Sequence, residues 1–192
     1  MSISGIILAG GKGRRMGGAD KGLVEFLGKP LVSHVIQRLE PQVNELLISA
    51  NREIDTYASF GYPVISDDVE DFAGPLAGLH KGLMQAKHPY VVTTPCDAPL
   101  LPMSLVNRLM RGLLDHDAEV AIAKTGQQPH PVFCLCRKTV LPHLQDFLLQ
   151  GGRRFEEWYG SLEAVEVLFN DTPQAFININ TREELQCQEK AA

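Results

Sequence analysis

A glycine-rich, positively charged segment follows the first apolar run of the chain. Between Leu8 and Lys21 the sequence holds five glycines, two adjacent arginines, two lysines and one acidic residue. Glycine lets backbone N–H groups approach an anion closely, and Lys and Arg side chains provide the charge that phosphate oxygens attract. These residue types predict a loop that wraps a polyphosphate, at the carboxyl end of a first β-strand at 3–8.

The spacing of this segment excludes two common phosphate-binding loops. A P-loop requires Gly-x-x-x-x-Gly-Lys followed by Ser or Thr, whereas the Gly-Lys pairs at 11–12 and 28–29 are followed by Gly13 and Pro30. A dinucleotide-binding loop requires Gly-x-Gly-x-x-Gly before a helix, and Met16 stands where the third glycine should be. A dinucleotide-dependent oxidoreductase stays an alternative, but this spacing counts against it.

Strand-like and helix-like segments alternate along the chain and must position this loop. The expected strands are at 3–8, 46–50, 62–65, 90–94, 120–124, 132–136 and 165–169. The expected helices are at 31–39, 76–86, 103–114, 140–149, 153–159 and 181–188. This alternation predicts an α/β fold with a mainly parallel, Rossmann-like sheet and helices on both faces. Ligands of such sheets bind beyond the carboxyl ends of the strands, where the loop, residues 49–51, Asp67 and Asp97 all fall.

Composition and charge place the chain among soluble globular domains. Its 192 residues fit one domain, and 44% hydrophobic with 21% charged residues is ordinary for that class. We expect no membrane span, because no apolar stretch approaches about 18 residues, and no signal peptide, because the charged segment follows the first apolar run. The net charge of −5 argues against a nucleic-acid partner, while the local positive charge suits a small anionic ligand.

The four cysteines show no Cys-x-x-Cys pair. Cys134 and Cys136 would point the same way from one strand, so they are either metal ligands or small core residues, and the core role is favoured. Reduced thiols and a cytoplasmic location follow as the expectation.

The glycine-rich segment belongs to a longer pattern. Its own motif is formed by Leu8, Gly10, Gly11, Arg15, Met16, Gly17 and Lys21. Four motifs follow in order at 74–78, 95–99, 130–131 and 178–181, reading Gly-Pro-Leu-Ala-Gly, Pro-Cys-Asp-Ala-Pro, His-Pro and Asn-Ile-Asn-Thr. The set resembles nucleotidyltransferases of the sugar-nucleotide pyrophosphorylase type and, among them, the molybdenum cofactor guanylyltransferases. The resemblance runs from 6 to about 185.

This resemblance implies a fold and an activity. The fold would be of the nucleotide-diphospho-sugar transferase type, one domain over 1–192 with a nucleotide half at about 1–100 and an acceptor half at about 101–192. The activity would be Mg²⁺-dependent transfer of GMP from GTP to molybdopterin with release of pyrophosphate. Other molybdenum cofactor biosynthesis proteins would be partners. A sugar-1-phosphate or cytidylyl nucleotidyltransferase and a non-catalytic GTP-binding regulator remain alternatives.

Catalytic and metal-binding roles are expected at four residues. Arg15 and Lys21 would contact the triphosphate. A small, hard cation bound to a nucleotide needs one or two carboxylates, and Asp97, framed by two prolines, is the candidate, although an aspartate there can also cap a turn. The resemblance adds Asn180, ahead of Asn178, as a second ligand. Both asparagines would otherwise turn the chain before a last helix, whose start is marked by the capping-box spacing of Thr181 and Glu184.

Base and acceptor contacts are expected elsewhere along the same edge. The resemblance places Leu8, Ala9 and Gly10 around guanine, with the backbone N–H groups of Ala9, Gly10 and Gly11 as phosphate donors. Asp67 matches a guanine contact, and a carboxylate can accept hydrogen bonds from the N1–H and N2–H₂ groups of that base. Ser49 stands where the family has asparagine, so Asn51 is the neighbouring candidate.

An arginine pair is the candidate for the acceptor site. Arg153 and Arg154 follow two glycines and would suit the phosphate of molybdopterin, or would simply be exposed charges at a helix start. His130 lies in a motif that resembles one near the pterin side.

Overall fold

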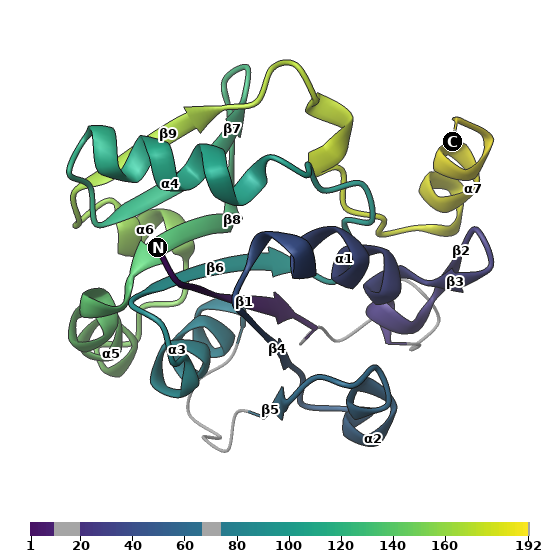
Figure 1. Ribbon diagram of the computed structural model, residues 1–192, viewed down its shortest axis with the longest axis horizontal. Coiled ribbons are helices and arrows are strands. Elements are labelled where there is room, and N and C mark those ends of the chain that lie inside the picture. Colours follow the sequence, from purple (N-terminus) through teal and green to yellow (C-terminus); the bar gives the residue numbers. More distant parts are fainter. Residues whose placement is uncertain (10–19, 67–73, 192) are drawn as a thin grey trace.

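Within residues 1–9, 20–66 and 74–191, which the computed structural model describes, seven strands form one sheet in the order β5-β4-β1-β6-β8-β7-β9 (Figure 1). These strands are β1 Ile3–Leu8, β4 Glu45–Ser49, β5 Val64–Ile65, β6 Tyr90–Pro95, β7 Val120–Thr125, β8 Gln128–Arg137 and β9 Ala164–Leu168. β8 runs antiparallel to β6 and β7, and the other neighbours in this sheet are parallel. The mainly parallel α/β sheet predicted from the alternation is confirmed.

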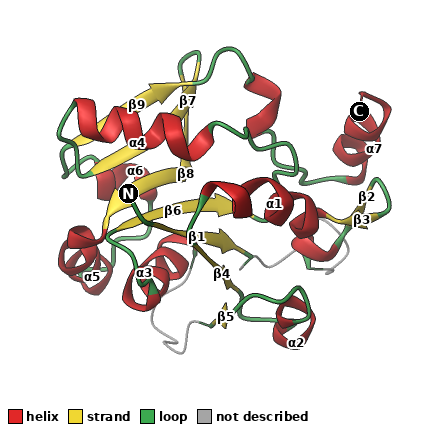
Figure 2. Cartoon of the chain, viewed as in Figure 1, coloured by secondary structure: helices red, strands yellow, loops and turns green. Residues whose placement is uncertain are grey.

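Helices cover both faces of the sheet, as Figure 2 shows. The α-helices are α1 Leu31–Leu39, α2 Ile54–Ala58, α3 Pro75–Gln85, α4 Leu105–Asp115, α5 Leu141–Leu149, α6 Phe155–Tyr159 and α7 Arg182–Ala191. The 3-10 helices are η2 Lys21–Leu23, η3 Glu40–Gln42, η4 Lys138–Val140 and η5 Pro173–Phe176. None of the helices in these described ranges is long and apolar enough to cross a membrane.

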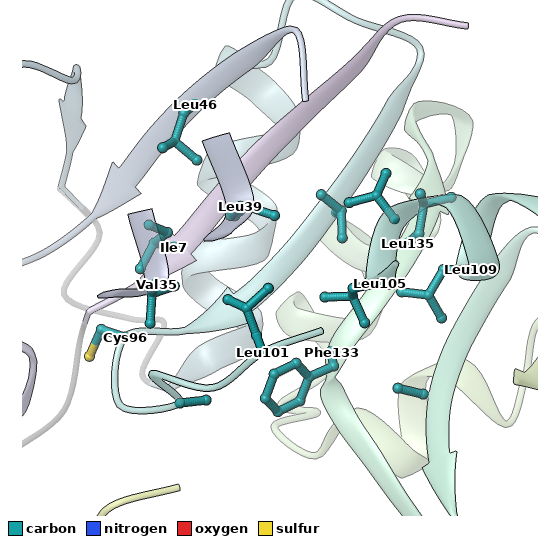
Figure 3. Packing of buried hydrophobic residues seen from close by; sticks show 14 of the residues in the cluster. Ile7, Val35, Leu39, Leu46, Cys96, Leu101, Leu105, Leu109, Phe133 and Leu135 are labelled. Atoms are coloured by element: carbon teal, nitrogen blue, oxygen red, sulfur yellow. The ribbon is translucent and has the colours of Figure 1, made fainter. Parts of the chain in front are cut away.

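Two apolar clusters fill the space between sheet and helices. Successive side chains of a strand point to opposite faces, so Ile7 packs with α1 and α4 in one cluster, part of which Figure 3 shows. Ile6 packs with α3, α5 and α6 in the other cluster, which includes the fully buried Trp158. Each large side chain buried in this way contributes about 1.5–3 kcal/mol, so the strands that carry the site are fixed from both sides.

Cys134 and Cys136 lie fully buried in the second cluster. Burial raises the pKa of the Cys134 thiol to about 12 and that of Cys136 well above its ordinary value. Both thiols therefore stay protonated at neutral pH and act as small core residues, which agrees with the favoured interpretation.

The end of the described chain returns to the first third of the sequence. α7 lies beside a small hairpin formed by β2 Glu25–Phe26 and β3 Lys29–Pro30 (Figure 1). Phe26 and Ile179 are buried together with Leu185 packed against them, and the Leu27 N–H donates to Glu189 Oε1 (3.1 Å). This packing brings residues 177–181 to the carboxyl edge of the central strands.

Candidate active site

The carboxyl ends of three parallel strands lie side by side at one edge of the sheet. Leu8 at the end of β1 pairs with Ser49 of β4 and with Pro95 of β6. The hydrogen bonding continues beyond β1, because the Ala9 N–H donates to the Ser49 carbonyl (2.7 Å) and the Cys96 N–H donates to the Leu8 carbonyl (3.1 Å). The residues that follow these strands therefore leave the sheet next to one another.

A lysine, an aspartate and an asparagine from distant parts of the chain meet at this edge. Lys21 Nζ lies 3.3 Å from Oδ2 of Asp97 and donates a hydrogen bond to Oδ1 of Asn180. Lys21 begins η2, Asp97 follows β6, and Asn180 precedes α7. The structure thus brings together three of the residues that the sequence singled out for catalysis or metal binding.

Asp97 is a buried carboxylate. The residue is only 6% exposed, and burial raises the pKa of its carboxyl group above the ordinary value, although the Lys21 ammonium opposes this change. Within the described residues, Oδ1 of Asp97 is buried and accepts no hydrogen bond. Such an oxygen is costly in the free protein, and it is a group suited to hold a cation.

Asn180 is fixed by contacts on both sides. The Ile179 N–H donates to the Asp97 carbonyl oxygen (2.9 Å), which lays this segment beside Asp97. The predicted capping box forms, because the Glu184 N–H donates to Thr181 Oγ1 (3.1 Å) and the Thr181 N–H donates to Glu184 Oε2 (3.1 Å). Glu184 Oε2 also accepts from the Asn180 N–H (2.6 Å). Asn180 therefore both turns the chain into α7 and presents its amide oxygen to Lys21.

The donor set suits a small, hard divalent cation. Asp97 offers a carboxylate oxygen and Asn180 an amide oxygen, and Mg²⁺ prefers oxygen ligands, completing its shell with phosphate oxygens and water. The Lys21 ammonium bridges these two side chains, so the position already attracts positive charge. The residues present therefore fit the metal that the sequence predicted.

Leu8 and Ser49 lie against helix α3 at the same edge. A Cβ atom added to Gly78 of α3 would lie 2.8 Å from Leu8 Cδ2 and 2.8 Å from Ser49 Oγ. Gly78 therefore permits the helix to approach the strand ends closely. Asn51 lies two residues beyond β4 and lines an open hollow of about 410 Å³ formed by residues 51–56.

The arginine pair lies elsewhere, on the turn between α5 and α6. Arg153 Nη1 donates to the carbonyl oxygens of Leu148 (3.0 Å) and Gly152 (2.7 Å). Arg154 Nη1 lies 3.7 Å from Glu157 Oε1. These contacts anchor both side chains to their own turn, and the acceptor role expected for them stays a prediction.

Comparison with known proteins identifies the family. A family model described as MobA-like NTP transferase domain matches residues 5–165. The chain belongs to this nucleotidyltransferase family. A molybdenum cofactor guanylyltransferase from Shewanella putrefaciens is 46% identical over 186 residues, which cover 97% of this chain and 95% of the relative. One from Cupriavidus taiwanensis is 49% identical over 192 residues, covering 97% and 96%.

Solved structures support the fold of this NTP transferase. Molybdopterin-guanine dinucleotide biosynthesis protein A from Archaeoglobus fulgidus superimposes with a TM-score of 0.82 at 22% identity, covering 98% of this chain and 97% of that one. A CMP:2-keto-3-deoxy-manno-octonic acid synthetase complexed with CTP gives a TM-score of 0.77 at 16% identity, covering 100% and 98%. The expected nucleotide-diphospho-sugar transferase type of fold is therefore confirmed.

Four residues of the expected NTP transferase site, Gly10, Gly11, Arg15 and Asp67, lie outside the described part of the chain. Their contacts with phosphate or base stay predictions of the motif. Of the others, Lys21, Asp97 and Asn180 form one cluster, and Leu8 and Ala9 lie at the same strand ends. The Ala9 N–H, which was expected to donate to phosphate, instead extends the sheet by donating to the Ser49 carbonyl.

Three residues that form or contact the turn carrying Lys21 were not predicted from the sequence. They are Asp20, Gly22 and Tyr57. Asp20 and Gly22 flank the predicted lysine, and that position was the available signal. Tyr57 lies in a segment with no clear apolar periodicity, so nothing in the sequence linked it to the site.

Replacing Gly78 with alanine should weaken both the fold and nucleotide binding in this NTP transferase. The added methyl group must displace Leu8 or Ser49, so we expect the free energy of unfolding to fall by about 1–3 kcal/mol. The dissociation constant for GTP should rise, because Leu8 is a predicted base contact. Thermal unfolding and calorimetric titration with GTP measure the two effects. Met84→Ala, which changes an exposed side chain on the same helix, is the control. An unchanged GTP affinity in Gly78→Ala would contradict the predicted contact between Leu8 and the base.

Proposed function

We propose that this protein transfers GMP from GTP to molybdopterin and releases pyrophosphate. The observation that carries the proposal is the identity of 46% and 49%, along nearly the whole chain, to two molybdenum cofactor guanylyltransferases. The cluster of Lys21, Asp97 and Asn180 at the carboxyl edge of the sheet supports it, because ligands of such folds bind there.

The acceptor in this reaction needs little activation. The terminal phosphate of molybdopterin is already ionised at neutral pH, so its oxygen can attack the α-phosphorus of GTP without a general base. A new P–O bond forms on the α-phosphorus as the bond to the β-phosphate oxygen breaks, and the electron pair leaves with pyrophosphate. The protein therefore has to position the two phosphates and neutralise charge.

We assign the positioning of the phosphates and the neutralisation of charge to individual residues. Lys21, which stands beside Asp97 in the free protein, would place its ammonium against the β- and γ-phosphates and stabilise the leaving group. We propose Mg²⁺ as the metal, held by Asp97 and Asn180. When bound, it supplies Lewis-acid stabilisation of the phosphoryl oxygens. Arg15 would share the charge of the triphosphate, and Leu8, Ala9, Gly10, Gly11, Asn51 and Asp67 would surround the nucleotide.

The acceptor side is proposed on chemistry alone. Arg153 and Arg154 would bind the phosphate of molybdopterin, since a guanidinium matches a phosphate in geometry and charge. Other molybdenum cofactor biosynthesis proteins as partners, and a cytoplasmic location, belong to the same proposal. The described cysteines are free thiols, which supports that location.

One experiment separates this function from its alternatives. The protein is incubated with MgCl₂, each of the four NTPs and either molybdopterin or a sugar-1-phosphate, and pyrophosphate and the nucleotide-linked product are measured. We expect product with GTP, and none when molybdopterin is left out. Preference for CTP would favour cytidylyl transfer, turnover of a sugar-1-phosphate would favour the pyrophosphorylases, and GTP binding without pyrophosphate release would indicate a regulator.

A further inference from the structure

Tyr57 reaches from helix α2 to the residue that precedes Lys21. The tyrosine is fully buried, and its hydroxyl donates a hydrogen bond to Oδ1 of Asp20. The same carboxylate oxygen accepts from the Gly22 N–H (3.2 Å). Asp20 is therefore hydrogen-bonded both to helix α2 and to the turn that carries Lys21.

The buried carboxylate of Asp20 depends on these donors. Asp20 is only 8% exposed, and a charge removed from water in this way is stable only when it is hydrogen-bonded. Burial raises the pKa of the Tyr57 hydroxyl far above its ordinary value. The hydroxyl therefore keeps its proton at neutral pH and always acts as a donor to Asp20.

Gly22 lies where the surrounding residues leave no room for a side chain. A Cβ atom at Gly22 would clash with the Tyr57 hydroxyl and would lie 3.2 Å from both Cβ and Sγ of Cys96. The turn is thus packed between Tyr57 on one side and Cys96 on the other. Cys96 directly precedes Asp97. The same packing therefore fixes the position of the turn relative to Asp97, the candidate metal ligand.

These contacts determine where the Lys21 side chain starts. Asp20 and Gly22 flank Lys21 in the chain, and both are held by the contacts described above. With its backbone fixed on both sides, Lys21 extends to within 3.3 Å of Asp97 Oδ2. Movement of Asp20 would move the base of this side chain.

We propose that Tyr57 is a positioning residue for GMP transfer, acting through Asp20 to hold Lys21 in the phosphate site. The inference rests on the proposed function and deepens it. It also assigns a role to α2. This helix begins within the segment 51–56 that would lie near the base, and Tyr57 links that segment to Lys21.

The test is Tyr57→Phe, which keeps the ring and removes only the hydroxyl. We expect kcat/KM for GTP to fall about tenfold, the effect of losing one hydrogen bond to a charged group, with KM for molybdopterin unchanged. The dissociation constant for GTP should rise by a similar factor. Tyr90→Phe, at the amino end of β6 and so at the opposite edge of the sheet, is the matched control and should match the wild type.

A second background separates positioning from simple loss of stability. The double variant Lys21→Met/Tyr57→Phe should have the same GTP dissociation constant as Lys21→Met alone, because Tyr57 acts through Lys21. Calorimetric titration measures this even in an inactive variant. An equal loss of GTP affinity in both backgrounds would overturn the proposal, as would wild-type kcat/KM in Tyr57→Phe.

The proposed function and this inference fail in different ways. A wild-type protein that forms no guanine dinucleotide contradicts the function. If the wild-type protein and Tyr57→Phe are equally active, only the role of Tyr57 is contradicted. Thermal unfolding of each variant, with assays run well below the transition, ensures that folded protein is compared throughout.

Discussion

Asp97→Asn should slow GMP transfer by on the order of 10²-fold or more and, at neutral pH, make the protein more stable. The first effect follows from the loss of the carboxylate proposed to hold the metal. The second follows from burial, which raises the pKa of this carboxyl group and shows that its charge is unfavourable in the folded state despite Lys21.

The sign of the pH dependence is fixed by the direction of this shift. Below the ordinary pKa of 3.8, Asp97 is protonated in both the folded and the unfolded state, and its charge costs nothing. As the pH rises through the higher pKa of the folded state, the buried carboxylate ionises and wild-type stability is lost. The asparagine variant has no such group, so its advantage should grow between those two pKa values and then stay constant.

Thermal unfolding of both proteins from pH 4 to pH 8 measures this difference, and each kcal/mol gained raises Tm by roughly 2–4 °C for a domain of this size. Asp146→Asn, which removes an exposed carboxylate on α5, is the control and should change neither activity nor stability appreciably. A folded Asp97→Asn variant with wild-type turnover and Mg²⁺ dependence would contradict the metal assignment. A stability difference independent of pH would contradict the burial argument.

Lys21→Met should cost as much activity as Asp97→Asn, on the order of 10²-fold, but should change stability in the opposite direction. Without the ammonium, Asp97 stays buried and loses the partner that lowers its pKa. Removing one member of a fully buried pair costs about 3–5 kcal/mol. Here the Lys21 side chain is 25% exposed, so we expect a loss of about 1–3 kcal/mol at neutral pH.

The double variant Lys21→Met/Asp97→Asn should recover most of that stability, because no unpaired charge then remains. Denaturant unfolding of the two single variants and the double variant gives the coupling between the residues directly. Lys87→Met is the matched control, since Lys87 pairs with Glu45 at 3.2 Å but is 79% exposed, and surface pairs contribute about 0–1 kcal/mol. Additive losses in the double variant would show that Lys21 and Asp97 act independently.

The long elements could be predicted from the sequence because their apolar residues repeat with a clear period. The strand Ile3–Leu8 and the helix Leu31–Leu39 begin and end where the pattern indicated. The hairpin of β2 and β3 and the short helix α2 were missed. Two-residue strands and a helix of five residues carry no period, and they form because the surrounding structure holds them.

In the site, too, some residues could be predicted from the sequence and others could not. Lys21, Asp97 and Asn180 could be named from their motifs, but their meeting depends on strand register and on the return of the chain to Asp97 through Ile179. Tyr57 could not be named, because its partner Asp20 is 37 positions away and reads in the sequence as an ordinary loop acid. For Arg153 and Arg154 the described contacts show local anchoring, and the proposed acceptor role rests only on the match between a guanidinium and a phosphate.

The hydrogen bond from the Ile179 N–H to the Asp97 carbonyl has a consequence for synthesis. The chain is synthesised from its N-terminus, and every strand of the large sheet precedes Asn180 in the chain. All strands of the sheet, together with Lys21 and Asp97, are therefore synthesised before this asparagine. A chain interrupted before Asn180 would retain these strands and the lysine–aspartate pair but would lack the amide oxygen that we propose as the second metal ligand.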